Sequence, residues 1–517
     1  MTSRVSHLYP FLFAMVPVLH LAAINPGEST LGDLLVVLLA VLVGCALVYA
    51  VAALVLRGRG SALPALVTFI GVLFFFGLRE RAHVLLAPVF LVAGVPVVRG
   101  LVRRPPLLER LSSLLTLTGG LLVVWSAGGD VSNRLRANES VKASALVRRL
   151  ARPIATVTSA GAVQPRRDIY LIVLDEYANS GVLRQEYGYD NRRFEDSLRR
   201  LGFVLPPVVQ SNYVHSMLSV PSLLNASHLT AATAEVGAAA KDPTLAYYLL
   251  NHSRVVRFLQ ARGYRFVFFP SGWWFATRDH PLANLEYRAS TGVRLGRELT
   301  RSELRRVLLR NTLLDYLYRS HAPDAEHVRS TLAGVARVPE LRGPVLVVAH
   351  LINPHSPFVF ERDCRTAPWR SGRGERGGVY VAQVECLNGM LLRLVTTLLR
   401  ESAVPPIILL QGDHGTKRLK FSYYPTADSI PAAAARERLG AFGAYYLPSH
   451  GAEAFGDTVT VVNVLGNVLR YYFNADLPRE PDDRYLSLGR SPYAFHKVDP
   501  RWLAREAPGP GESRASD

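Results

Sequence analysis

One stretch in the chain of 517 residues reads Ile169-Tyr170-Leu171-Ile172-Val173-Leu174-Asp175-Glu176. An unbroken apolar run of this kind is typical of a strand that is buried on both faces of a parallel sheet. Two carboxylates follow the run directly. Because ligands bind at the carboxyl ends of the strands in open α/β sheets, we expect Asp175 and Glu176 to lie at the functional edge of the domain.

The sequence after this stretch alternates between apolar runs and helical patterns. Further strands are predicted at residues 264–269, 345–350 and 407–411. Apolar residues recur at helical spacing in residues 191–201, 253–262, 302–318 and 380–400. This alternation predicts βαβ units, and therefore an α/β domain with a mostly parallel central sheet.

Most of the apolar excess lies in the first 130 residues. The mean hydropathy of +0.15 and the charged fraction of 19% indicate that part of the chain lies in lipid. Uncharged runs at residues 34–56, 61–78 and 111–129 are each near the roughly 20 residues that cross a bilayer, and shorter runs at 9–25 and 84–98 contain prolines. We predict an N-terminal polytopic helical membrane domain with about five transmembrane helices, four being the alternative.

The arginines in this region gather on one side of the predicted spans. Arg4 precedes the first span, Arg57 and Arg59 follow the second, and residues 99–110 between the fourth and fifth contain four more. Short basic loops stay in the cytoplasm, so an odd number of spans exports the rest of the chain. We therefore expect a multi-pass protein of the cell (inner) membrane whose domain after the spans is extracytoplasmic.

The net charge of +18 is also explained by contact with a membrane surface. The basic residues are spread along the chain without the aromatic and basic stripe that binds nucleic acid, so we expect the bilayer as a partner and no nucleic acid. We place the domain limits at 1–130 for the membrane domain, 131–167 for a linker, 168–490 for the α/β domain and 491–517 for a partly disordered tail. Within the linker, residues 141–150 can form a basic amphipathic helix at the lipid surface or a plain solvated helix.

Polar residues also follow the last predicted strand, in Gly412-Asp413-His414-Gly415. Parallel strands end at one edge, so Asp413 and His414 should lie near Asp175. Carboxylate and imidazole together are ligands for a divalent metal ion such as Zn or Mn, although an Asp-His pair can also be a simple turn and cap. Glu176 is either a further ligand or points to solvent.

Hydroxyl groups recur at helical spacing at Ser216, Ser219 and Ser222. A hydroxyl at a helix start near a metal ion can act as a nucleophile, while backbone N–H groups hold a phosphate or sulfate. Alternatively, these serines are a helix N-cap and small residues that pack in the core.

His355, between Pro354 and Pro357, is held in a loop. An imidazole there suits an anionic substrate or a leaving group.

The order of these motifs along the chain resembles the alkaline phosphatase superfamily. The nearest branch is similar to sulfatase-type (sulfatase-like) membrane proteins, which include lipoteichoic acid synthases and lipid A phosphoethanolamine transferases. In these, several N-terminal spans carry an extracytoplasmic metal-dependent domain. The resemblance covers residues 168–488 and includes Gln383 and Asn388 in the predicted helix 380–400.

The resemblance implies a role for each matching position. Asp175 corresponds to the first metal ligand, Asp413 and His414 to the later pair, and His355 to the residue that contacts the substrate anion. Ser216 corresponds to the nucleophile, which is also a metal ligand. One divalent ion is implied, Zn or Mn, with Mg or Ca as alternatives.

Two departures from the family pattern matter. Ser216 stands where the transferases usually have Thr and the sulfatases have a Cys or Ser that becomes formylglycine. Leu223 replaces the arginine of the sulfatase maturation code, which argues against a sulfatase and leaves Ser219 as the alternative nucleophile.

The implied activity is transfer of a phospho-alcohol head group from a lipid donor to an envelope glycan or lipid through a Ser-linked intermediate. The alternatives are a hydrolase of sulfate or phosphate esters and a catalytically silent envelope protein. Lys417 can hold an anionic head group, and Trp273 with Trp274 either lines an acceptor groove or packs in a core. Cys364 and Cys386 can pair if the geometry permits.

The orientation of the chain can be tested with reporter fusions. A phosphatase-type reporter fused after Asp130 should be active, because the basic loops hold the opposite side in the cytoplasm. Activity of a cytoplasmic reporter alone at this position would contradict the predicted topology.

Overall fold

The chain divides into two compact units, Met1–Glu139 with Val293–Arg319, and Ser140–Gly292 with Ser320–Asp517. The structure is a computed structural model. It describes residues 7–25, 29–57, 60–76, 100–101, 103–157, 166–271, 280–287, 303–310, 312, 322–368, 376–418 and 421–503.

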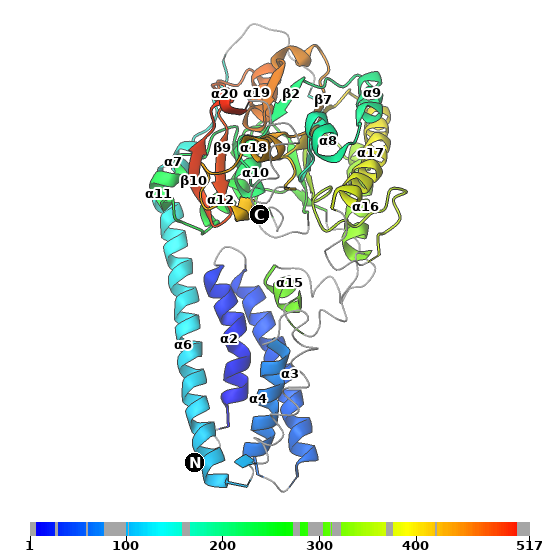
Figure 1. Cartoon of the computed structure of the whole chain (residues 1–517). Coiled ribbons are helices and arrows are strands. Elements are labelled where there is room, and N and C mark those ends of the chain that lie inside the picture. Colours follow the sequence, from blue (N-terminus) through cyan, green and yellow to red (C-terminus); the bar gives the residue numbers. More distant parts are fainter. Residues whose placement is uncertain are drawn as a thin grey trace, which may run out of the picture. The chain divides into compact units, whose positions relative to one another are not determined.

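The first unit contains long apolar helices (Figure 1). They are α2 (Tyr9–Ile24), α3 (Leu31–Val55), α4 (Ala62–Phe76) and α6 (Pro105–Ala143). By length and composition, α3 and α6 can cross a membrane, and α2 and α4 are shorter apolar helices. Leu39 on α3 is 64% exposed and Trp125 on α6 is 81% exposed, which suits lipid better than water.

The predicted apolar N-terminal helices are thus confirmed, and the number of spans stays a prediction. The predicted span at residues 84–98 lies outside the described residues. Helix α6 approaches α2 closely at Gly119, where an added Cβ would lie 3.0 Å from Leu12 Cβ. Small residues allow such close approach of helices in lipid.

Helix α6 continues past residue 130 to Ala143, so the first part of the predicted linker is helical. Ser144 then caps α7 (Ala145–Ala151) by accepting a hydrogen bond from Val147 N at 3.0 Å. Leu146 and Leu150 of α7 are buried in a cluster with Tyr213 of the second unit. This packing differs from both sequence-based alternatives for residues 141–150.

A six-stranded sheet forms the centre of the second unit. Its strands are β1 (Ile169–Leu174), β3 (Arg265–Phe269), β4 (Leu285–Glu286), β5 (Val345–Leu351), β6 (Ile407–Gly412) and β7 (Gly443–Tyr446). Their order is β4-β3-β5-β1-β6-β7, and all neighbours are parallel except β6 and β7. The four predicted strands and the mostly parallel sheet are therefore confirmed.

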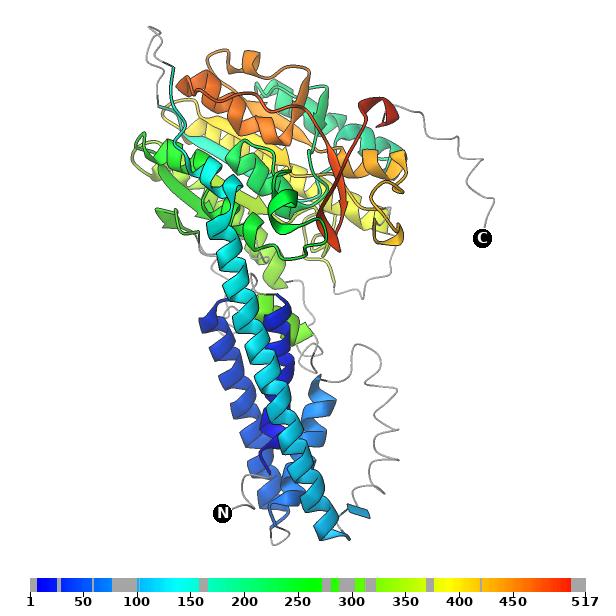
Figure 2. The same ribbon diagram turned by 90° about the vertical axis from the view of Figure 1, so that its left-hand side faces the viewer.

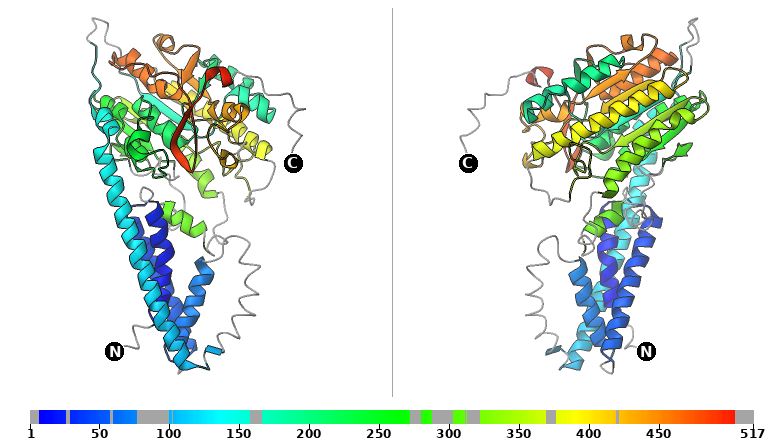
Figure 3. Two further views of the ribbon diagram at one scale, coloured as in Figure 1. Left: turned by 60° about the vertical axis from the view of Figure 1, so that its left-hand side comes forward. Right: turned by 90° about the vertical axis from the view of Figure 1, so that its right-hand side faces the viewer.

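Helices cover both faces of the sheet. One face carries α8 (Ser180–Tyr187), α9 (Arg192–Arg200), α16 (Ala322–Ala336) and α17 (Arg376–Glu401). The other carries α10 (Ser216–Asn225), α12 (Thr244–Asn251), α13 (Arg254–Gln260) and α19 (Val464–Phe473). The right-hand view of Figure 3 shows α16 and α17 side by side over the sheet. Strand β1 is buried along its whole length because alternate side chains enter the two cores, which explains its unbroken apolar run.

Shorter elements complete the chain. Strands β2 (Val208–Gln210) and β8 (Thr458–Thr460) form a parallel pair, and β9 (Tyr485–Leu488) and β10 (Ser491–Lys497) form an antiparallel pair, seen in orange to red in Figure 2. The remaining α-helices are α11 (Ala232–Val236), α15 (Glu303–Arg310), α18 (Ala432–Leu439) and α20 (Pro500–Leu503). Short 3₁₀ helices lie at Val338–Glu340, Phe421–Tyr423, Gly451–Ala454 and Val461–Asn463.

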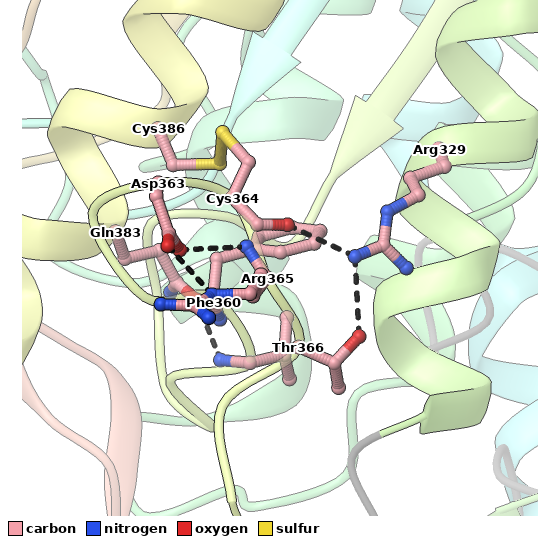
Figure 4. Close-up of a disulfide and its surroundings, with 9 residues drawn as sticks. Arg329, Phe360, Asp363, Cys364, Arg365, Thr366, Gln383 and Cys386 are labelled. Atoms are coloured by element: carbon pink, nitrogen blue, oxygen red, sulfur yellow. Dashed lines mark hydrogen bonds and ion pairs between the residues drawn. A yellow bond between two sulfur atoms is a disulfide. The ribbon is translucent and has the colours of Figure 1, made fainter.

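The loop after β5, which carries His355, is fastened to α17 at two points. Cys364 and Cys386 form a disulfide, with their Cα atoms 5.1 Å apart (Figure 4). The sequence had left open whether these two cysteines can pair. The second point is Gln383, one turn of α17 before Cys386, whose side chain is fully buried.

The amide of Gln383 makes four hydrogen bonds to the backbone of this loop. Its Nε2 donates to the carbonyl oxygens of Pro354 and His355 at 3.0 and 3.1 Å. Its Oε1 accepts from the N–H groups of Val359 and Phe360 at 2.7 and 3.3 Å. One side chain therefore fixes the backbone on both sides of Pro357.

Replacing Gln383 should release this loop. In Gln383→Leu the amides of Val359 and Phe360 lose their acceptor, and we expect a loss of about 1–3 kcal/mol in the free energy of unfolding. Hydrogen exchange of the peptide that contains Val359 and Phe360 should become faster. The control is Thr396→Val on the same helix, where an exposed hydroxyl bonds only Leu392 O. Equal exchange in the two variants would contradict this role of Gln383.

Candidate active site

The site begins where β1 and β6 end side by side, with Leu174 paired in register with Gly412. This pairing places Asp175 next to Asp413, and both carboxylates are buried. Glu176 adopts a left-handed backbone (φ 60°) and its N–H donates to Asp413 Oδ1 at 3.2 Å. An added Cβ at Gly412 would lie 2.5 Å from Tyr177 O, so only glycine permits this close approach.

Several polar atoms here are buried without a hydrogen-bond partner. They are Asp175 Oδ1, Asp413 Oδ2 and both ring nitrogens of His350. Asp175, His350 and Asp413 each offer a ligand atom, and these atoms lie within 4.8 Å of one another. Buried polar atoms without partners are costly, and a divalent cation would satisfy all three side chains. The residues present therefore fit a metal ion.

The sequence analysis gave no role to His350. It lies on β5, in register with Val173 of β1, and its Nε2 is 3.6 Å from Asp175 Oδ2. The sequence did contain a signal for His350 as a site residue: it is a histidine near the carboxyl end of an otherwise apolar, fully buried strand.

The two aspartates have opposite pKa shifts. Burial, and then the nearby carboxylate of Asp175, raise the pKa of Asp413 to about 7. Burial also acts to raise the pKa of Asp175, but the nearby imidazoles of His355 and His350 outweigh it and hold the pKa at about 2. Two carboxylates this close do not both ionise readily without a neighbouring cation.

Ser216 is the first residue of α10, and its Oγ lies 3.0 Å from His414 Nε2. His414 Nδ1 lies 3.0 Å from Gly415 O, which can only accept, so Nδ1 carries the proton and Nε2 presents a lone pair to Ser216. Burial, and then the charge of Arg438, hold the pKa of His414 well below its usual range. The imidazole is therefore neutral, as a ligand or a proton acceptor must be.

The alternative nucleophile, Ser219, is placed differently. It is fully buried, and its Oγ hydrogen-bonds Ser211 Oγ at 2.8 Å and Tyr213 O at 3.2 Å. Ser222 donates to Ser219 O at 2.8 Å. Of the three serines, Ser216 alone contacts His414 in the hydrogen bonds of the described residues.

Glu176 is buried and does not point to solvent. Its Oε1 lies 2.6 Å from Arg438 Nη1 and 2.8 Å from Lys417 Nζ. His355 Nε2 lies 3.7 Å from the same oxygen and 2.6 Å from Lys417 Nζ. Burial raises the pKa of Glu176, but His355, Lys417 and Arg438 outweigh it and lower the pKa.

The structure thus brings together Asp175, Ser216, His355, Asp413, His414 and Lys417 from the predicted set. Trp273 and Trp274 lie outside the described residues. The sequence analysis missed Arg438, because a short helix that reads Ala-Ala-Ala-Ala-Arg-Glu-Arg-Leu resembles any solvated helix.

No family model matches the sequence, and no curated protein is a match. In structure the chain is similar to phosphoethanolamine transferases and to sulfatases. The C-terminal periplasmic domain of EptC from Escherichia coli is 11% identical, with a TM-score of 0.44, covering 68% of this chain and 97% of that chain.

Two further similar structures cover different shares of this chain. Lipooligosaccharide phosphoethanolamine transferase A from Neisseria meningitidis, an integral membrane protein, is 13% identical with a TM-score of 0.41, covering 92% of this chain and 96% of that chain. A putative sulfatase from Bacteroides fragilis is 12% identical with a TM-score of 0.34, covering 62% and 76%.

The metal site can be tested by metal analysis of the full-length protein purified in detergent and loaded with zinc. We expect about one divalent ion per chain. Replacing Asp413 and His414 together with Ala should abolish metal binding, and His350→Ala should weaken it, because each change removes buried ligand atoms. Asp428→Ala, which removes an exposed carboxylate, is the control. Unchanged metal content in the double variant would disprove the site.

Proposed function

We propose that the chain is a membrane-anchored, metal-dependent phosphotransferase that moves a phospho-alcohol head group from a lipid donor to an envelope glycan or lipid. The observation that carries the proposal is the Ser216 hydroxyl at the start of α10, 3.0 Å from His414 Nε2 and beside the unpartnered carboxylates. The domain limits of 1–130, 131–167, 168–490 and 491–517 and the extracytoplasmic location of the catalytic domain are part of the same proposal.

In this proposal Asp175, His350 and Asp413 hold one divalent ion, Zn or Mn, with Mg or Ca as alternatives. When bound, the ion would stabilise the anionic oxygens of the substrate and lower the pKa of a nearby hydroxyl. The family resemblance also assigns His414 and Ser216 to the ligand set. The two assignments are alternatives for His414, because the single lone pair of Nε2 serves either the ion or the proton of Ser216.

Ser216 is the nucleophile of the first step. Its Oγ attacks the phosphorus of the donor phosphodiester, the Oγ–P bond forms, and the P–O bond to the lipid alcohol breaks. His414 Nε2 accepts the hydroxyl proton, since it lies 3.0 Å from Oγ and presents a lone pair. The N-terminus of α10 favours the negative charge that develops there.

His355 and Lys417 lie where the leaving group departs. Their Nε2 and Nζ atoms are 2.6 Å apart, and Lys417 is partly exposed, so a proton can pass to the lipid alkoxide from this side. In the second step an acceptor alcohol attacks the phosphorus and gives its proton to the His355 and Lys417 pair. The Oγ–P bond breaks, and the proton held by His414 returns to Ser216 Oγ. Trp273 is proposed to line the acceptor path.

A hydrolase of phosphate or sulfate esters is the alternative function, and it differs only in that water replaces the acceptor alcohol in the second step. The retained polar groups around Ser216 argue against a silent envelope protein. The apolar helices α3 and α6 favour a donor that is itself held in the bilayer.

Substitution of the two serines tests the nucleophile. Ser216→Ala should lower turnover by several orders of magnitude without unfolding the chain, as expected for loss of a covalent catalyst. Ser219→Ala is the matched variant and should lose far less, because its hydroxyl is engaged with Ser211 and Tyr213.

A mass spectrum of the segment around Ser216 distinguishes the functions. A phosphoglycerol or phosphoethanolamine mass on Ser216 supports the transferase, and a formylglycine mass supports a sulfatase. Near-normal turnover of a phosphodiester or sulfate ester by Ser216→Ala would contradict both the nucleophile and the two-step mechanism.

A further inference from the structure

Residues 293–319 belong to the first unit, which holds the apolar helices, although the chain before and after them belongs to the second unit. They lie between β4 and α16 along the sequence, and α15 (Glu303–Arg310) is the described helix within them. The chain therefore passes between the two units at residues 139–140, 292–293 and 319–320. The mechanism above gives this excursion no role.

Helix α15 packs on α2 and α3 through two leucines. Leu304 and Leu308 lie four residues apart and therefore on one face of the helix, and they are 3% and 9% exposed. The apolar cluster that they enter contains Val18, Leu19 and Ala22 of α2 with Leu34 and Val37 of α3. Burial of two leucines stabilises the docked helix, because it removes their apolar surface from water.

An ion pair adds a specific contact beside the leucines. Arg305 Nη2 lies 3.2 Å from Asp33 Oδ1, and the two side chains are only 12% and 15% exposed. The other oxygen of Asp33 accepts a hydrogen bond from Thr30 Oγ1 at 2.8 Å, and Thr30 caps the start of α3. The cap thus fixes the carboxylate, and a pair held in this way and shielded from solvent is stronger than an exposed one.

Further polar contacts gather at the same end of the apolar helices. Arg134 of α6 pairs with Asp130 at 2.9 Å and donates to Ser29 O at 2.6 Å, and Asn133 Nδ2 donates to Ala23 O at 2.7 Å. After Asp33, α3 has no charged residue as far as its end at Val55. Charged groups at the ends of apolar spans are typical of the boundary between lipid and water, so α15 lies at this boundary.

We propose that residues 293–319 are a second anchor of the second unit, with α15 locked onto α2 and α3 by the Asp33–Arg305 pair. The first connection is the passage from α6 to α7. A second anchor limits how far the second unit moves from the bilayer, and therefore raises its effective concentration toward a substrate held there. This preference for a bilayer-held donor over a soluble ester rests on the proposed function and deepens it.

Hydrogen exchange of the peptide 303–310 tests the anchor, in the full-length protein in nanodiscs of phosphatidylethanolamine and phosphatidylglycerol. Asp33→Asn and Arg305→Gln should each speed exchange at least about tenfold, because each leaves a shielded charge without its partner. The double variant should exchange no faster than the faster single variant, since both changes remove the same interaction. The control is Asp196→Asn, which breaks an exposed ion pair with Arg199 on α9.

Three exchange results would overturn the anchor. They are parent-like exchange in both single variants, additive effects in the double variant, and an equal acceleration in Asp196→Asn. If the variants of the ion pair do not fold, Leu304→Ser decides, because it weakens the apolar contact and keeps the ion pair. Parent-like exchange in that variant would overturn the docked helix.

Turnover in the same nanodiscs tests the substrate preference. Asp33→Asn should lower turnover of a phospholipid donor at least about fivefold and leave turnover of water-soluble bis(p-nitrophenyl) phosphate near that of the parent. An equal loss for both substrates would overturn the preference. If the parent turns over neither substrate, the proposed function fails, and the exchange results by themselves decide whether the anchor exists.

Discussion

The structure of the site depends on two buried carboxylates that lie next to each other. Asp175 and Asp413 follow β1 and β6, which pair in parallel register at the centre of the sheet, so neither can move away without breaking the sheet. Close packing of Gly412 against the backbone of Tyr177 and Phe442 leaves no space for a side chain at this position. Burial, and then repulsion from Asp175, raise the pKa of Asp413, and the neighbouring imidazoles hold the charge on Asp175.

The surroundings of these carboxylates follow from that constraint. Histidines and cations enter from three further segments: His350 from β5, His355 from the loop after it, and Arg438 from α18. Gln383 and the disulfide fix the His355 loop to α17, so the imidazole is held by elements that pack on the sheet core. The site is thus assembled from rigid elements and their short extensions, which suits electrostatic chemistry that needs fixed charges.

Around the nucleophile, the polar groups divide into two kinds. Val214 O, Gly415 O and Glu176 satisfy the structural hydrogen bonds of Arg438, and Ser211 and Tyr213 satisfy those of Ser219. Ser216 Oγ, His414 Nε2 and Arg438 Nη2 instead face one another at 3.0 and 3.3 Å. A group of half-satisfied donors and acceptors in a buried site is unfavourable for stability, so its presence points to a ligand.

The sequence by itself determined the buried parallel strands, because unbroken apolar runs of this length have few other stable settings. The sequence also placed Asp175 and Asp413 at strand ends and the Ser216 hydroxyl at a helix start, because these positions depend only on neighbouring residues along the chain. The tertiary structure alone decided that Ser216 and not Ser219 faces His414, that Cys364 pairs with Cys386, and that His350 and Arg438 join the site. The physical reason is distance along the chain: Arg438 and Glu176 are 262 residues apart, and only the packed sheet and helices bring them into contact.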